Sequence, residues 1–323
     1  MSLTNNNFYK HIENNYIFEK NPKIAVAVSG GPDSMALLFL IKKISEVKRG
    51  HLSVLIVDHN LRQESKIESK NIFNYLKKQN IKSRIFSVNK KNILKKNMNE
   101  ARKNRYDILS NFCLKNNILH LFIGHHKDDL LETFVSRSIM GSDFDGLKAI
   151  SEITVYNKVC LIRPLIKWTK NDIYKYNKKN NIFFLEDPSN KNLKYSRSII
   201  RKYINDSDKE IISEIKKDYN TVNKNILLFK TMLSEFLIQN IKSSSERSLT
   251  LPLDNLMRNN DIFLENIIKK IYKFFFKNTI NLRSKKILIL ISLIKKDNFK
   301  IFNLKGMFVK KTNNSLIFLI KSN

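Results

Sequence analysis

The first part of the chain alternates between short apolar runs and longer stretches whose apolar residues recur at helical spacing. Residues 23–29 form a nearly continuous apolar run, as in a strand buried on both faces, and residues 35–44 then show helical spacing. Three more strand-like runs each precede a predicted helix: 52–57 before 67–78, 83–88 before 101–115, and 119–123 before 128–139. Strands that alternate with helices form βαβ units. The pattern therefore predicts an α/β domain with a parallel, Rossmann-like sheet covered by helices on both faces.

The alternation becomes looser after about residue 140. A strand is predicted at 158–163, a helix at 169–180 and a largely helical region over 195–239. Helices at 261–276 and 282–295 and strands at 299–304, 307–311 and 315–320 complete the chain, and the serines at 243–245 are expected to form a linker. We therefore expect a catalytic domain over residues 1–206, a helical connector over 207–245, and a small C-terminal α+β domain over 246–323.

The chain carries a large excess of positive charge. Its 59 Lys and Arg residues outnumber its 29 Asp and Glu residues, which gives a net charge of +30 and a pI near 9.9. This excess favours a polyanionic partner, because each phosphate that a protein neutralises releases counterions. The chain is also rich in Lys, Asn and Ile and poor in Gly and Pro, the bias expected of an AT-rich coding sequence. The alternative explanation is therefore that compositional drift raised the net charge without any nucleic-acid function.

Cysteine usage and apolar run lengths limit the class of protein further. Cys113 and Cys160 are far apart and form no CxxC pair, so neither a disulfide framework nor a Cys-rich metal site is indicated. The N-terminal segment has no apolar signal-peptide core, and runs such as 287–294 are too short to span a bilayer. We expect a cytoplasmic protein that does not contact a membrane. The sequence leaves the oligomeric state open, a homodimer included.

The loop after the first predicted strand has the composition of a phosphate-binding loop. It consists of Ser29, Gly30, Gly31, Pro32, Asp33 and Ser34. Adjacent glycines let backbone N–H groups converge on one anion, and the N-terminus of the following helix adds its positive dipole end. Asp33 and Ser34 are each expected to be able to cap this helix, and Asp33 is alternatively a ligand for phosphate-bound Mg²⁺. The loop is neither a Walker A motif nor GxGxxG. A plain strand-to-helix turn is disfavoured, because two of only seven glycines are adjacent here.

Further polar residues follow the second and fourth predicted strands, where ligands of parallel sheets bind. Asp58 and His59 come after the second strand, and Gly124 begins a His-His-Lys-Asp-Asp segment after the fourth. The latter segment has three interpretations. The first is a zinc site, which is disfavoured because adjacent His side chains point apart and nothing completes a ligand set. The second is a plain helix N-terminus with capping Asp residues. The favoured interpretation makes His125 a phosphate or substrate contact and makes Asp128 or Asp129 a ligand for a cation or an amine. Glu132 shares a helix face with Asp129.

Arginines supply the candidate contacts to phosphate or RNA. Arg102 and Arg105 are three residues apart and share a helix face, although Arg pairs on surface helices are most often merely solvated. Weaker cases are Arg137, Arg163, Arg197 and Arg201, and the turn that contains Asp187 and Asn190 is expected to line the same cleft. Trp168 lies in an apolar run and is expected to serve a core.

Several motifs together carry a family resemblance. They are Ser-Gly-Gly-Pro-Asp-Ser at 29–34, Val-Asp-His-Asn-Leu-Arg at 57–62, Glu-Ala-Arg at 100–102 with Arg105 and Tyr106, Gly-His-His-Lys-Asp-Asp at 124–129 with Glu132, and Arg-Pro-Leu at 163–165. The loop resembles the PP-loop of N-type ATP pyrophosphatases, and the whole set, over residues 22–205, resembles tRNA(Ile)-lysidine synthetases. The C-terminal strands resemble, more loosely, the small substrate-binding domain of that family.

The resemblance implies an activity and roles for the candidate residues. It implies ligation of lysine to C2 of the wobble cytidine in a tRNA(Ile) with a CAU anticodon, with ATP as co-substrate and Mg²⁺. The implied catalytic residues are Asp33, His125, Asp128, Asp129, Glu132 and Arg105. Residues 29–34 with Asp58, His59 and Gly124 would bind ATP, and Asp33 and Asp129 would bind Mg²⁺. The implied substrate contacts are Arg102, Arg137, Arg163, Asp187, Asn190, Arg197 and Arg201.

Three other functions compete with this one. A PP-loop amide-forming synthetase would need ammonia delivered by a glutaminase, and no catalytic Cys context is visible. A PP-loop tRNA sulfur transferase would activate a base oxygen in the same way, but its cytidine-thiolating members use CxxC pairs that this sequence lacks. A non-catalytic basic RNA-binding protein would not need acidic residues and glycines around a cleft.

Overall fold

The computed structural model describes residues 2–58, 64–88, 98–186, 196–276, 282, 284–296 and 298–320. The chain forms two compact units, Met1–Val222 and Asn223–Asn323. The division falls within helix α9 (Lys209–Asn240). Each unit has its own sheet and its own apolar core.

The first unit is built on a six-stranded sheet with the strand order β3-β2-β1-β4-β6-β5. Its strands are β1 (Lys23–Val28), β2 (His51–Asp58), β3 (Ser83–Ser87), β4 (His120–Phe122), β5 (Ile153–Tyr156) and β6 (Val159–Ile162). Neighbouring strands are parallel except β5, which pairs antiparallel with β6. The predicted parallel sheet is confirmed. The pattern missed β5, a short half-exposed edge strand that forms a hairpin with the predicted fifth strand.

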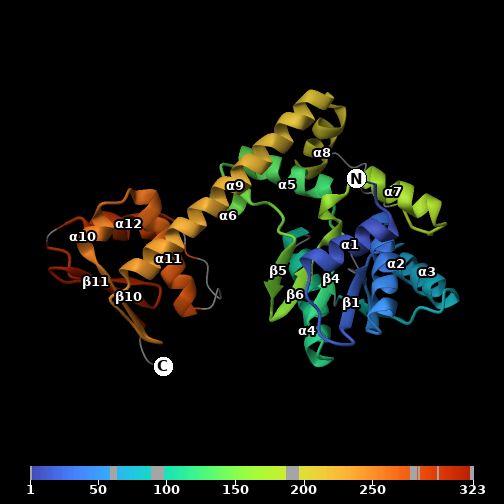
Figure 1. Ribbon diagram of the computed structural model, residues 1–323, viewed down its shortest axis with the longest axis horizontal. Coiled ribbons are helices and arrows are strands. Elements are labelled where there is room, and N and C mark those ends of the chain that lie inside the picture. The colour runs from blue at the N-terminus through green and yellow to red at the C-terminus, as the bar shows by residue number, and fades with distance from the viewer. Residues whose placement is uncertain are drawn as a thin grey trace. The chain divides into compact units, whose positions relative to one another are not determined.

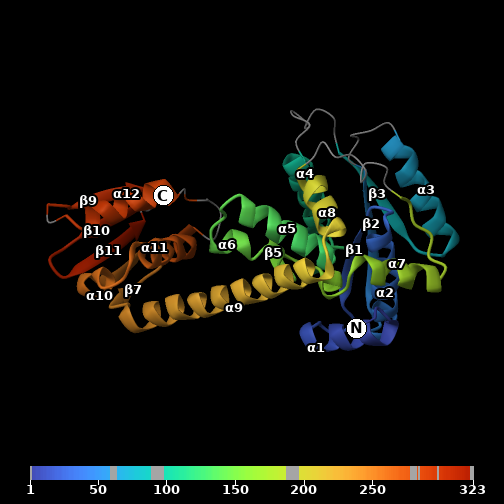
Figure 2. The same cartoon turned by 90° about the horizontal axis from the view of Figure 1, so that it is seen from above.

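Helices cover both faces of this sheet, as predicted. Figure 2 shows α2 (Pro32–Val47) and α3 (Glu64–Lys78) on one side and α4 (Met98–Lys115) on the other. Alternate residues of β1 serve the two faces: Ile24 and Val26 join the core under α2, whereas Ala25 joins the core under α4. Because both faces are buried, the strand is apolar without alternation.

The described residues of the first unit form further helical elements before α9 (Figure 1). They are α1 (Asn5–Asn15), α5 (Lys127–Ile139), α6 (Phe144–Leu147), the 3₁₀ turn η2 (Pro164–Lys167), α7 (Lys170–Lys179) and α8 (Ser196–Asp206). Helix α1 was not predicted. It buries Phe8 completely, and the ring of Phe8 lies 5.7 Å from that of Trp168, which is 2% exposed. The expected core role of Trp168 is thereby confirmed.

The second unit combines an antiparallel sheet with short helices. The sheet order is β7-β8-β11-β10-β9, with β7 (Ser243–Ser244), β8 (Ser248–Pro252), β9 (Ile301–Leu304), β10 (Met307–Lys311) and β11 (Ser315–Ile320). Its helices are α10 (Leu253–Met257), α11 (Asp261–Phe276) and α12 (Ser284–Ile294). Ile267 of α11 and Ile291 of α12 share one core with Val309 and Phe318 of the sheet.

One expectation about this unit is wrong. The serines at 243–245 are not a linker, because Ser243 and Ser244 pair with β8 and the backbone N–H of Ser245 donates to the Ser248 carbonyl at 2.8 Å. These inter-strand hydrogen bonds are made by the serine backbone. The pattern of side chains therefore does not reveal the strand. Of the described helices, none combines the length and the apolar character that crossing a bilayer requires.

Candidate active site

The carboxyl ends of β1 and β4 bring two of the predicted motifs together. β1 lies between β2 and β4, so the strand order reverses there, and open α/β sheets bind ligands at such a point. A Cβ added to Gly124 would lie 3.0 Å from both the carbonyl carbon of Asp33 and the backbone nitrogen of Ser34. Glycine at position 124 therefore allows the segment after β4 to approach the backbone of the 29–34 loop.

The loop itself is held in a tight turn by its own serines. Gly30 has φ +89°, and a Cβ there would come within 2.7 Å of Ile72 Cγ1. The hydroxyl of Ser34 accepts from the backbone N–H of Ser29 at 3.1 Å and donates to the carbonyl of Gly31 at 3.0 Å. The serine hydroxyls thus shape the backbone.

Helix α2 begins without a side-chain cap. Gly31 is the N-cap residue and makes no capping side-chain hydrogen bond, while Pro32 occupies the first turn. The expectation that Asp33 or Ser34 caps the helix is wrong, because both lie inside the first turn and the Ser34 hydroxyl bonds within the loop. An uncapped helix N-terminus next to a glycine turn suits an anion such as phosphate.

His126, rather than His125, lies among the acidic residues. It caps α5 through Nδ1, which accepts from the backbone N–H groups of Asp128 at 3.2 Å and Asp129 at 3.3 Å. Nε2 is therefore the nitrogen that carries a hydrogen in the neutral ring. It lies 3.5 Å from Asp129 Oδ2 and 3.8 Å from Asp33 Oδ1. The imidazole thus connects the 29–34 loop with the first turn of α5.

Asp33 is the most unusual carboxylate of the site. Its Oδ1 is buried and has no hydrogen-bond partner. Burial raises the pKa of Asp33, and the charge of Asp129 raises it further, whereas His126 and Lys170 act in the opposite direction. A buried carboxylate oxygen with no donor, beside a second carboxylate, suits a cation.

The donor set fits Mg²⁺ bound together with phosphates. Within the described ranges, no three His, Cys, Asp or Glu side chains form a group that could hold a metal ion by themselves. Mg²⁺ in nucleotide sites is usually held by one or two carboxylates plus substrate phosphates and water. Asp33 and Asp129 would supply those carboxylates, and the orphaned Oδ1 of Asp33 is the atom that a cation would satisfy.

Three arginines gather around Tyr106, next to His125. Arg102 Nε donates to the Tyr106 hydroxyl at 3.3 Å, and the Arg105 guanidinium lies 5.3 Å from the centre of the Tyr106 ring. Arg163 is 5% exposed, and its charge also acts on Tyr106. Burial lowers the pKa of His125 to about 3, with the charge of Arg163 contributing, so this imidazole is neutral at neutral pH. His125 Nδ1 is buried without a partner, which leaves it available to a ligand.

Glu132 and Arg201 form a buried ion pair between α5 and α8. Arg201 donates from Nε to Glu132 Oε1 at 2.6 Å and from Nη2 to Oε2 at 3.1 Å, and the Glu132 side chain is 4% exposed. Arg201 Nη2 also lies 3.9 Å from Asp129 Oδ1. The two residues were expected to have separate roles. The structure joins them in one pair at the edge of the acidic cluster.

Other predicted site residues are engaged in structural bonds. Asp58 is 2% exposed and accepts from the Ser65 hydroxyl at 2.6 Å. Asp128 Oδ2 accepts from the backbone N–H of Lys170 at 2.7 Å, and Arg137 donates to the carbonyl of Gly146 at 2.6 Å. His59, Asp187 and Asn190 lie outside the described residues, as does the side chain of Arg197.

Two residues of α7 belong to the site and were not predicted. The buried Asn177 donates from Nδ2 to the carbonyl of Pro32 at 2.9 Å and so fastens α7 to the 29–34 loop. Lys170, two helical turns earlier on the same face, is close enough to affect the pKa of Asp33. The available signal was Asn177, a polar residue beside the apolar Ile173 and Tyr176 on the buried face of a predicted helix.

Comparison with known proteins agrees with this geometry. Residues 2–207 match the family model of the PP-loop domain. The chain is 42% identical to the tRNA(Ile)-lysidine synthase of Orientia tsutsugamushi (strain Boryong) over 197 residues, which is 60% of this chain and 44% of that protein. It is 37% identical to the enzyme of the same name from Wolbachia pipientis wMel over 209 residues, 64% of this chain and 48% of that one. The chain thus spans about half the length of the curated relatives that it matches.

A solved structure shows the same fold. The U34-tRNA thiolase NcsA from Methanococcus maripaludis superposes with a TM-score of 0.58 at 17% identity, over 68% of this chain and 79% of that one. The expected resemblance to the lysidine synthetases is confirmed by the curated relatives. With the loop, the sheet order and the family match over most of the first unit, the chain belongs to the PP-loop domain family.

Proposed function

We propose that the protein ligates lysine to C2 of the wobble cytidine of a CAU-anticodon tRNA(Ile), with ATP as co-substrate and with AMP and pyrophosphate as products. The curated relatives of this name and the net charge of +30 support an RNA substrate. The observation that carries the proposal is the meeting of Asp33, His126 and Asp129 beside the uncapped start of α2. This arrangement offers an anion site and a cation site side by side.

The first step activates the base. The C2 carbonyl oxygen of the cytosine attacks the α-phosphorus of ATP, and the bond from that phosphorus to the leaving pyrophosphate breaks. Backbone N–H groups of the 29–34 loop and of the start of α2 would bind the pyrophosphate, where negative charge increases. Mg²⁺, held by Asp33 and Asp129, would neutralise phosphate charge. Lys170 is a further cation next to Asp33.

The second step transfers the lysine. Its neutral ε-amine attacks C2, the new C–N bond forms, and the C2–O bond breaks so that AMP leaves with the oxygen. The amine loses a proton in the process. Before the reaction an ammonium group needs an acidic partner. Glu132 is engaged with Arg201 and Asp129 is assigned to Mg²⁺, so we assign no single carboxylate of this face to the ammonium group.

The cysteines give no support to the sulfur-transfer alternative. Burial raises the pKa of Cys113 to about 12, whereas a sulfur-carrying thiol needs a low pKa. Cys160 pairs with His120, the first residue of β4, and so lies toward the amino-terminal end of these strands rather than at the carboxyl edge of the sheet. An RNA-binding protein without catalysis would gain nothing from the buried Oδ1 atom of Asp33, which has no hydrogen-bond partner.

The test is lysine incorporation. The protein is incubated with ATP, Mg²⁺, labelled lysine and a CAU-anticodon tRNA transcript, and label in the RNA is measured together with pyrophosphate. Asp33→Ala should abolish both signals and leave RNA affinity nearly intact. The exposed Asp218→Ala is the matched control and should retain both. Absence of label, or incorporation of sulfur or ammonia in place of lysine, would refute the proposal.

A further inference from the structure

A second pocket of the first unit lies away from the 29–34 loop. It has a volume of about 770 Å³, within the range of small-molecule sites. Four lysines line it from separate segments, namely Lys127 at the start of α5, Lys148 after α6, Lys167 in η2 and Lys216 in α9. We call it the lysine pocket.

The charge of this pocket is not neutralised within the described protein. In the described part of the chain, none of the four lysines takes part in an ion pair. The acidic residue of the lining is Glu152, whose carboxylate accepts from the Tyr16 hydroxyl and lies 2.8 Å from His11 Nε2. This carboxylate is held by His11 of α1 and by Tyr16, and its charge also acts on Lys167. The pocket as a whole attracts anions.

The floor of the lysine pocket is apolar and includes one aromatic ring. Leu130, Leu131 and Ile150 form a small core there, with Ile166 and Tyr219 packed against it. The Tyr219 ring is held edge-on against Phe134, with 5.4 Å between centroids. An apolar floor with an aromatic ring, surrounded by ammonium groups, matches a heterocyclic base joined to phosphate.

Helix α5 separates the pocket from the acidic cluster. With 3.6 residues per turn, Leu130 and Leu131 lie on the face opposite to Asp129 and Glu132. Lys127 directly precedes the two aspartates. A strand of RNA whose reacting base is at the acidic side therefore has neighbouring nucleotides within reach of the other side of the same helix.

We propose that the lysine pocket binds a nucleotide of the substrate RNA other than the one that reacts, with its base on the floor near Tyr219 and its phosphates on the lysines. The identification of the ligand as RNA rests on the proposed function. The volume accommodates one or two nucleotides, and an acidic peptide would not use the aromatic floor.

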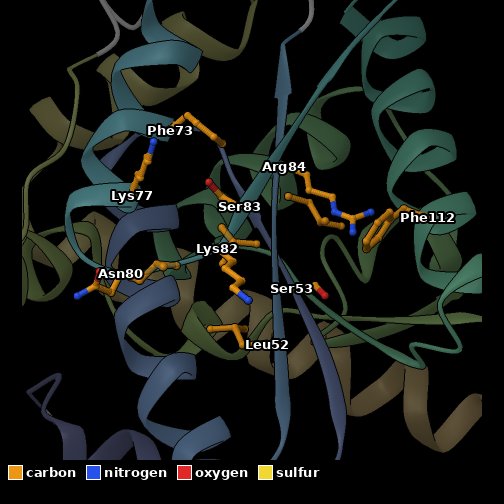
Figure 3. A pocket seen from close by; sticks show the side chains of 12 residues that line it. Leu52, Ser53, Phe73, Lys77, Asn80, Lys82, Ser83, Arg84 and Phe112 are labelled. Atoms are coloured by element: carbon orange, nitrogen blue, oxygen red, sulfur yellow. The ribbon is translucent and has the colours of Figure 1, made fainter.

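A matched control pocket exists in the same unit. Its volume is about 750 Å³, and its lining includes Lys77, Lys82 and Arg84 (Figure 3). It lies at the amino-terminal half of β2, which is the end of the sheet away from the 29–34 loop. Arg84 points toward Phe112 there, with 5.2 Å from its guanidinium carbon to the ring centroid. This pocket is also basic and of similar size, but it does not lie beside α5. Variants here therefore show how much RNA binding is lost when positive charge alone is removed.

The test is RNA binding by the full-length chain without ATP or lysine. A 17-nucleotide anticodon stem-loop is titrated by fluorescence anisotropy. The KCl concentration is varied from roughly 50 to 300 mM, so that the slope of log K against log salt is measured. The lysine-pocket variant is Lys148→Glu with Lys167→Glu, and the control is Lys77→Glu with Lys82→Glu; all four side chains are exposed. Lys148→Gln with Lys167→Gln is a milder second variant, and circular dichroism confirms folding of each.

The lysine-pocket Glu variant should bind about 10-fold or more weakly than wild type, and the slope of log K against log salt should fall by about 0.7 for each lost phosphate contact. The Gln variant should fall between wild type and the Glu variant. Equal losses in the lysine-pocket and control variants would overturn the inference. So would unchanged RNA binding together with lost binding of free CMP or of an oligoglutamate peptide.

Lysine incorporation is measured on the same proteins to separate the two proposals. If wild type incorporates no lysine but the lysine-pocket variant still loses RNA binding, the proposed function fails and the pocket assignment stands. If incorporation proceeds in that variant with wild-type RNA affinity, the pocket assignment fails and the proposed function stands.

Discussion

Gly124→Ala should push the segment after β4 and the 29–34 loop apart by steric overlap. The new methyl group would lie 3.0 Å from two backbone atoms of Asp33 and Ser34, whereas ordinary contacts are 3.4–4 Å. Backbone atoms cannot rotate away, so the loop must move by roughly 0.4 Å. Overpacking of this kind costs about 1–3 kcal/mol. A 1 Å misplacement of reacting groups costs about 10²-fold in rate, so a shift of this size should lower kcat by roughly 10-fold.

The assay is pyrophosphate release at saturating ATP, lysine and tRNA, with thermal denaturation measured in parallel. We expect a Tm lower by about 2–12 °C, from 2–4 °C per kcal/mol for a unit of this size. Gly141→Ala is the control, since no atom lies within 4 Å of its added Cβ and the cost is confined to backbone strain at φ +62°. A folded Gly124→Ala protein with wild-type kcat would show that the approach of β4 to the loop is irrelevant to catalysis.

Four further variants test the site. Arg201→Met removes both hydrogen bonds from Arg201 to the buried Glu132 and should lower the free energy of unfolding by about 3 kcal/mol, seen as a Tm decrease of about 6–12 °C. Glu132→Gln should lower the Tm by less, because the Arg201 side chain that it leaves unpaired is 25% exposed. An equal Tm decrease in the two variants would contradict this. Burial raises the pKa of Asp33, so this carboxylate favours the fold most below its unfolded pKa and loses that contribution as the pH rises through its folded pKa. Asp33→Asn should therefore raise the Tm at pH 7, by an amount that shrinks toward pH 4, while abolishing activity; a lower Tm at pH 7 would contradict the assignment. Asn177→Ala removes the bond to the Pro32 carbonyl at 2.9 Å and should cost about 1–3 kcal/mol and raise the KM for ATP, whereas an unchanged Tm and KM would refute the anchoring role.

Much of the fold is visible in local pattern. The run at 23–29 is apolar without alternation because both faces of β1 are buried, and this indicated a parallel sheet before any contact was known. The loop at 29–34 was recognisable because two glycines and a helix start stand next to each other. By contrast, β5 and β7 are short edge strands with weak patterns, and β7 consists of serines whose pairing is made by the backbone alone.

The partners within the site were not visible in this way. Adjacent histidines look equivalent in sequence, but only His126 caps α5 and lies between Asp33 and Asp129. Its neighbour His125 is half-buried beside arginines instead. Which of the two points toward the acids depends on where the helix begins, and element boundaries are the least reliable part of a sequence-based prediction.

Residue order alone therefore established the class of the first unit and predicted its phosphate loop and the edge of the sheet at which ligands would bind, because those features depend on spacing within short segments. Tertiary structure decided which charges meet. Glu132 and Arg201 are separated by 69 positions yet form one ion pair, and Asn177 reaches the Pro32 carbonyl across 145 positions. Such pairs depend on how helices pack on the sheet, since a buried charge or amide takes whichever partner the packing brings within hydrogen-bond distance.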